Sequence, residues 1–193
     1  EDHIGAIPYI LKQINIPIYG TRLTLGLIKN KLEEHKLLRT TKLHEVEAGK
    51  TVNFGKMKVE FIRSCHSIPD AVMLAIYTPV GTIFHTGDFK IDFTPINSEV
   101  TDLARIAEIG SKGVLALLSE SSFSENIGHT SPSHKLESYF KDAINKAGGR
   151  LLFLALPTHI YTLQDIFSAA KNSHRKIVIM GKKLQNVINM AIE

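Results

Sequence analysis

The stretch His85-Thr86-Gly87-Asp88-Phe89-Lys90 decides the fold, because it places a carboxylate directly after a predicted strand. The apolar run before it, residues 80–84, is typical of a buried strand. A carboxylate held at a strand end can bind a metal ion with both of its oxygens. The same residues also suit an ordinary turn, in which Gly87 has a positive φ and Asp88 bonds its own backbone. Both interpretations stay open until the other polar residues are placed.

The bulk composition indicates a globular chain of one domain or slightly more. The 193 residues are 44% hydrophobic and 22% charged, which is enough apolar material for a core. The net charge of +4 is compatible with a polyanionic partner such as nucleic acid but does not require one. The single cysteine, Cys65, excludes an intramolecular disulfide and favours a reducing, cytoplasmic compartment. No apolar run approaches the roughly 20 residues of a membrane span.

Neither end of the chain has the pattern of a natural terminus. The chain opens at Glu1 and Asp2 without the basic region and apolar stretch of a signal peptide. Patterned segments run up to both ends, so we expect a piece of a longer protein.

Hydrophobic periodicity predicts two domains, 1–123 and 124–193. In the first, the pattern predicts a helix near residues 4–14, strand 16–20, helix 22–36 capped by Thr21, strands 42–46 and 57–63, a hairpin of 71–78 and 82–86, helix 102–109 and buried strand 113–118. After a polar loop, it predicts helix 134–147, strand 151–155, helix 160–171, strand 176–180 and helix 182–192. The second set is typical of a parallel α/β sheet.

Five chemically active residues share one property: each lies in a loop beside a predicted strand. They are Asp2, His3, His66, Asp88 and Glu120. Taken singly, Asp2 suits a helix cap, His66 a solvated loop residue and Glu120 a turn cap. Together they can converge at one sheet edge, where histidine nitrogen and carboxylate oxygen suit Zn²⁺ or Mn²⁺. Two such ions about 3.5–4 Å apart could share Asp88 as a bridge.

At this point the sequence resembles the metallo-β-lactamase-fold hydrolases, and among them the β-CASP nucleases of the ribonuclease J family. The resemblance rests on the runs 2–11, 17–25, 66–70, 81–90 and 117–121. It covers essentially the whole chain and is most specific up to Glu120. It implies an αββα sandwich of the metallo-β-lactamase fold, of α/β (α+β) class, followed by the start of a β-CASP α/β domain.

The resemblance also implies a site with two divalent metal ions, Zn²⁺ or Mn²⁺. Asp2 and His3 would hold the second metal, His66 the first, and Asp88 would bridge them. His85 would support a ligand rather than bind metal itself.

Further roles are implied for the loop after residue 117. Glu120 matches an acidic motif that would orient a ligand histidine and support proton transfer. Ser131 and Ser133, in the run 130–133, would lie near RNA.

The implied activity is 5′-to-3′ exonucleolytic and endonucleolytic RNA cleavage, in RNA maturation and decay in the cytoplasm. RNA would be the substrate, and the full-length protein would form a homo-oligomer or a hetero-oligomer with a paralogue. Since ligands of the family lie outside residues 1–193, we expect the isolated chain to be inactive.

Two alternatives remain open. Tyr161 and Thr162 stand where the family usually has His and Arg, which favours a degenerate, non-catalytic RNA-binding or scaffold subunit. A hydrolase of small esters or thiols would lack the second domain, and the pattern after Phe123 argues against it.

Overall fold

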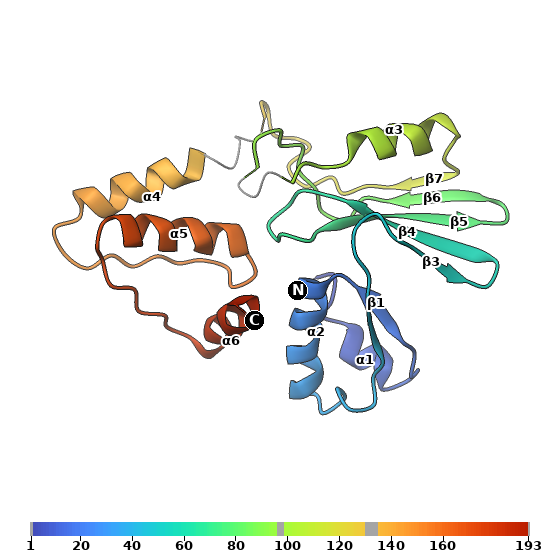
Figure 1. Cartoon of the computed structure of the whole chain (residues 1–193), viewed down its shortest axis with the longest axis horizontal. Helices are drawn as coiled ribbons and strands as arrows, with labels where there is room; N and C mark the ends of the chain where they lie inside the picture. Colours follow the sequence, from blue (N-terminus) through green and yellow to red (C-terminus); the bar gives the residue numbers. More distant parts are fainter. Residues whose placement is uncertain (1, 96–98, 130–134, 193) are drawn as a thin grey trace.

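In the first two thirds of the chain, a larger and a smaller β-sheet lie between helices (Figure 1). This computed structural model describes residues 2–95, 99–129 and 135–192. The larger sheet has the order β3 (Thr51–Phe54), β4 (Met57–Arg63), β5 (Val72–Thr78), β6 (Gly81–His85) and β7 (Ala116–Leu118). The smaller sheet pairs β1 (Ile18–Gly20) with β2 (Leu43–Glu45) in parallel.

Helices cover the outer side of each sheet. Helix α3 (Leu103–Ser111) packs on the larger sheet, where Ile109 joins Ile62, Met73 and Phe84 in a buried cluster. Helices α1 (Ile7–Leu11) and α2 (Arg22–Glu34) form a second core, which contains Leu11, Leu25, Ile28 and Leu32. The order of α3, larger sheet, smaller sheet and α1–α2 confirms the predicted layered α/β class (Figure 1).

The pairing of β6 with β7 determines where the functional loops meet. Strands β3 to β6 form antiparallel ladders, as the predicted hairpin required. Strand β7 instead runs parallel to β6, with Phe84 opposite Leu117. Because parallel neighbours end at the same edge of a sheet, the residues after His85 and after Leu118 leave it side by side.

The last third of the chain contains α4 (Lys135–Lys146), α5 (Ile160–Asn172) and α6 (Lys182–Ile192). All three helices were predicted. Helices α4 and α5 pack side by side around Ile144 and Ala169 (Figure 1). Helix α6 approaches α2 so closely that a Cβ on Gly26 would lie 2.6 Å from Met190 Sδ. Among the described residues, no helix has both the length and the apolar character needed to cross a membrane.

The predictions of strands 151–155 and 176–180 were wrong. Apolar runs form strands only where a neighbouring backbone supplies hydrogen-bond partners, and no described segment lies beside either run as a partner strand. Leu152, Leu154, Val178 and Met180 are exposed as a result.

Other boundaries also differ from the predictions. The first helix is shorter than the 4–14 pattern suggested and leaves Ile10 and Ile14 exposed, while Ala6 rather than Asp2 precedes it. Strand β7 is not buried, since the side chains of Leu117 and Leu118, which point to opposite faces of the sheet, are both exposed. Strand β3 was not predicted.

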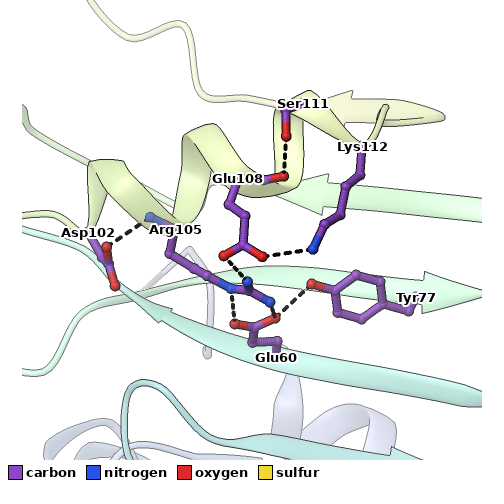
Figure 2. Close-up of polar contacts among 7 residues, drawn as sticks. All are labelled: Glu60, Tyr77, Asp102, Arg105, Glu108, Ser111 and Lys112. Atoms are coloured by element: carbon purple, nitrogen blue, oxygen red, sulfur yellow. Dashed lines mark hydrogen bonds and ion pairs between the residues drawn. The ribbon is translucent and has the colours of Figure 1, made fainter.

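A polar network ties α3 to the sheet (Figure 2). The Arg105 guanidinium donates to both carboxylate oxygens of buried Glu60, at 2.7 and 2.9 Å, and Tyr77 donates to Glu60 at 2.7 Å. Arg105 also bonds Glu108, which accepts from Lys112 at 2.7 Å. The bond from Arg105 lowers the pKa of Glu60, and burial followed by the Glu60 bond raises the pKa of Tyr77 to about 12.

Replacing Glu60 by Gln should destabilise the fold by about 1–3 kcal/mol. The amide keeps only one acceptor oxygen, and its NH₂ group would stand where the second carboxylate oxygen now accepts from Arg105. The lowered pKa of Glu60 gives stability that is complete above its unfolded value and is lost as pH falls through the folded value. The variant should therefore lose part of the acid sensitivity of unfolding, measured by urea titration at several pH values. Glu108→Gln, on the exposed side of the same network, should change stability little.

Asp165 in α5 should give the opposite pH dependence. Its side chain is buried, its Oδ2 atom has no hydrogen-bond partner among the described residues, and burial followed by nearby Glu137 raises its pKa. A raised carboxyl pKa favours folding below the unfolded value, and this advantage disappears as pH rises through the folded value. Asp165→Asn should raise the Tm at neutral pH by a few degrees, since about 1 kcal/mol shifts the Tm by about 2–4 °C at this size.

Thermal unfolding at acidic and neutral pH tests this. Asp142→Asn on α4, whose side chain is 72% exposed, is the matched control and should leave the Tm unchanged. An equal gain for Asp165→Asn at both pH values would contradict the assignment.

Candidate functional site

The turn that carries Asp88 is held by the conformation of Gly87 and by hydrogen bonds of Thr86. Gly87 has φ +55°, the left-handed conformation that favours glycine. The buried Thr86 donates its amide to Leu118 O at 3.0 Å and its hydroxyl to Gly87 O at 2.7 Å. The same hydroxyl accepts the Glu120 amide at 3.2 Å, so the segments after β6 and β7 are hydrogen-bonded to each other.

The two residues after Asp88 are held from opposite sides. The Phe89 amide donates to Glu120 Oε1 at 2.8 Å, and the Lys90 amide donates to Cys65 O at 2.7 Å. Asp88 therefore lies between the loop that follows β4 and the loop that follows β7. Its backbone position is fixed by parts of the chain that are far away in sequence.

Asp88 meets two residues from the start of the chain. His3 Nε2 lies 3.1 Å from Asp88 Oδ1 and 3.6 Å from Asp2 Oδ2. One ligand atom from each of the three residues lies within 4.8 Å of the others. A hydrogen bond from its own backbone, followed by the charge of His3, lowers the pKa of Asp2.

This donor set fits a divalent cation. Ligand atoms about 2.0–2.2 Å from one ion lie at most about 4.4 Å apart, so a small movement of exposed side chains would bring all three into range. One imidazole nitrogen and two carboxylates also match the preferences of Zn²⁺ and Mn²⁺. The turn interpretation and the metal interpretation of Asp88 are thus compatible, because Gly87 makes the turn while the carboxylate points to His3.

His66 does not join this cluster. Its Nδ1 lies 3.2 Å from the Ser67 hydroxyl, and no described group of three ligands includes it. Its loop is nevertheless anchored, because Asp70 Oδ2 accepts the Leu23 amide at 2.7 Å in the first turn of α2. That bond replaces the predicted Thr21 cap, since Thr21 stands at the N-cap position but its hydroxyl bonds Thr24.

The remaining predicted residues have mixed outcomes. Glu120 receives the Phe89 amide, so the structure gives it a role in holding the Asp88 turn, and its action on a ligand histidine stays a prediction. His85 Nδ1 accepts the Gly87 amide at 3.0 Å, and its supporting role also stays a prediction. Ser131 and Ser133 lie outside the described residues.

Sequence patterns missed two groups near the site. The Thr101 hydroxyl accepts the Cys65 amide at 3.0 Å and donates to Lys90 O at 3.2 Å, which joins two loops of the site. Burial, followed by the charge of nearby His66, lowers the pKa of His159 just before α5. No local motif marks either residue, because both act through contacts distant in sequence.

Comparison with known proteins shows which proteins the chain is similar to. The chain is 44% identical over 190 residues to "Ribonuclease J" of a Synechocystis species, 42% identical over 193 residues to "Ribonuclease J 1" of Streptococcus pyogenes, and 38% identical over 191 residues to "Ribonuclease J2" of Bacillus subtilis. The chain is homologous to ribonuclease J. These alignments cover 97%, 100% and 99% of the chain but only 30%, 34% and 34% of the relatives, so the chain spans about a third of the ribonuclease J length.

The fold has a counterpart among solved structures. A crystal structure of a protein of unknown function from Enterococcus faecalis matches with a TM-score of 0.65 and 16% identity, over 92% of this chain and 43% of that one. This likeness supports the fold alone. No protein-family model matches the chain.

The contact between Glu120 and the Phe89 amide predicts how Glu120 variants behave. Glu120→Gln keeps an oxygen that can accept this amide, so it should retain Zn²⁺ affinity at the Asp88 cluster. Glu120→Ala removes the acceptor and should weaken Zn²⁺ binding by about 10- to 100-fold. Isothermal titration with Zn²⁺ measures both. Equal affinities for wild type and Glu120→Ala would contradict the positioning role.

Proposed function

We propose that the whole protein that carries this chain is a metal-dependent ribonuclease. The observation that carries the proposal is the cluster of Asp2, His3 and Asp88 in a chain homologous to ribonuclease J along its whole length. The relatives are named as ribonucleases, and RNA phosphodiesters are therefore the proposed substrate. The net charge of +4 is compatible with such a polyanion.

Each residue of the site has a proposed part. Asp2, His3 and Asp88 would hold divalent ions, Zn²⁺ or Mn²⁺, together with His66, and Asp88 would be shared between two of them. When bound, such ions supply Lewis acidity at a phosphodiester. Glu120 accepts the Phe89 amide and so holds the backbone turn that carries Asp88.

The finer features belong to the same proposal. They are 5′-to-3′ exonucleolytic and endonucleolytic cleavage in the cytoplasm, RNA bound between segments 1–123 and 124–193, and a homo-oligomer or paralogue hetero-oligomer. We also expect residues 1–193 alone to cleave no RNA, and a 5′-labelled RNA assay on the purified chain tests this.

A second candidate is a non-catalytic paralogue that binds RNA or acts as a scaffold. The observation in its favour is Tyr161, which stands where the family usually has His. Its side chain is half-buried, and burial followed by the charges of Cys65, Glu99 and Asp70 raises its pKa. Tyr161 therefore supplies a neutral phenol where a histidine would supply a basic imidazole.

Asp88→Ala in the whole protein should lower RNA cleavage by at least about 100-fold, because it removes the ligand shared by the site. Cleavage of 5′-labelled RNA in the presence of Zn²⁺ or Mn²⁺ measures the effect, and metal analysis of the purified variant should show reduced occupancy. Wild-type cleavage should stop when EDTA removes the metal.

Asp142→Ala is the matched control, since it removes an exposed carboxylate of α4 whose Oδ2 accepts a hydrogen bond from Lys146 Nζ at 3.4 Å. It should cleave RNA like the wild type. Cleavage that survives both EDTA and Asp88→Ala would overturn the proposed metal dependence. RNA that is bound but not cleaved by the metal-loaded wild type would overturn the enzyme proposal and support the scaffold.

A further inference from the structure

The loop after β7 presents an aromatic ring that the fold does not use. Phe123 is 83% exposed, although phenylalanine side chains normally contribute to cores. Its backbone has φ +60°, in the left-handed region that bulky residues rarely adopt. Burial of the ring does not offset the backbone strain at Phe123. Backbone strain of this kind is concentrated at functional positions.

The position of Phe123 relative to the candidate metal site follows from the chain. Glu120 is hydrogen-bonded to Phe89, next to Asp88, and Phe123 follows Glu120 by three residues. Three residues span at most about 11 Å, so the ring lies within reach of the candidate site. The loop after β6 leaves from the same sheet edge and carries another exposed ring, Phe93, which is 73% exposed.

We propose that Phe123 is a base-stacking residue for single-stranded RNA next to the candidate metal site. Every nucleobase has a flat π face, so an exposed ring beside the site can hold a base without reading its sequence. The ring is exposed to solvent and not packed in the core. This inference rests on the proposed ribonuclease function and adds a contact with the bases to a site otherwise built for phosphodiesters.

The test is RNA binding by the whole protein in EDTA, where the RNA is not consumed. The probe is a fluorescein-labelled oligoadenylate of about 10 nucleotides, within the usual range of single-strand sites, and the readout is fluorescence anisotropy. Phe123→Ala and Phe123→Leu should weaken binding by about 5- to 100-fold, the range expected for loss of one stacked base. Phe123→Tyr keeps the ring and should bind like the wild type.

Two controls separate stacking from a structural role. Phe123→Gly removes the ring and also relieves the positive φ, so its Tm should stay equal or rise while RNA affinity falls. Val80→Ala trims an equally exposed apolar residue, 82% exposed, at the opposite end of β6, and should leave affinity unchanged. An abasic oligomer of the same length should bind wild type and Phe123→Ala equally.

The outcomes are distinguishable. If the wild type binds oligoadenylate and all Phe123 variants bind it equally, the stacking role is overturned while the ribonuclease proposal stands. The stacking role is also overturned if the Phe123 variants lose affinity for abasic and base-containing RNA alike. It is overturned as well if Phe123→Gly has a lower Tm than the wild type. If the wild type binds neither oligomer, both proposals fall.

Discussion

The candidate site depends on two hydrogen bonds that are donated by the backbone amides of the two residues after Asp88. Phe89 is held by the Glu120 carboxylate and Lys90 by the Cys65 carbonyl, so the turn is fixed from two sides. A metal ligand is useful only when its backbone and rotamer are held by surrounding groups. Here the holding groups come from the ends of β4 and β7, which makes the turn a property of the whole sheet.

The sheet in turn depends on how α3 is placed. Strand β7 is preceded by α3 and a short connection, and it pairs with β6 in parallel. The bond pair between Arg105 and Glu60 fixes α3 over β4, and the apolar contacts of Ile109 fix it over β5 and β6. The packing of α3 on β4, β5 and β6 and the parallel pairing of β7 with β6 together place the segment after β7, which carries Glu120 and Phe123.

Sequence patterns predicted the elements well where the signal is local. Helices α2 to α6 and the β5–β6 hairpin follow from periodicity and turn residues, because these signals lie within a few residues of each other. The strands expected at 151–155 and 176–180 failed because a strand needs a partner that no local pattern specifies. The Asp70 cap of α2 lies 47 residues from its amide, and the Glu120 contact spans 31 residues. The convergence of Asp2, His3 and Asp88 was expected from their places beside predicted strands and from the family resemblance, both of which also included His66. Spacing along the chain alone does not bring residues 85 positions apart together.

The three clustered ligands differ in how firmly they are held. The Asp88 side chain is 36% exposed on a fixed turn, whereas the side chains of His3 and Asp2 are 50% and 86% exposed. Immobilising exposed side chains on a metal costs conformational entropy, so most of that cost falls on the first residues of the chain. Two kinds of contact limit this entropy cost. Ile4 and Ile7 pack against the core that includes Leu11 and Leu32, and the Ile7 amide donates a hydrogen bond to Ile4 O. At the proposed metal site, the apolar core under α1 and α2 would therefore contribute to metal affinity although it contains no ligand, because metal binding would be coupled to the ordering of residues 2–7.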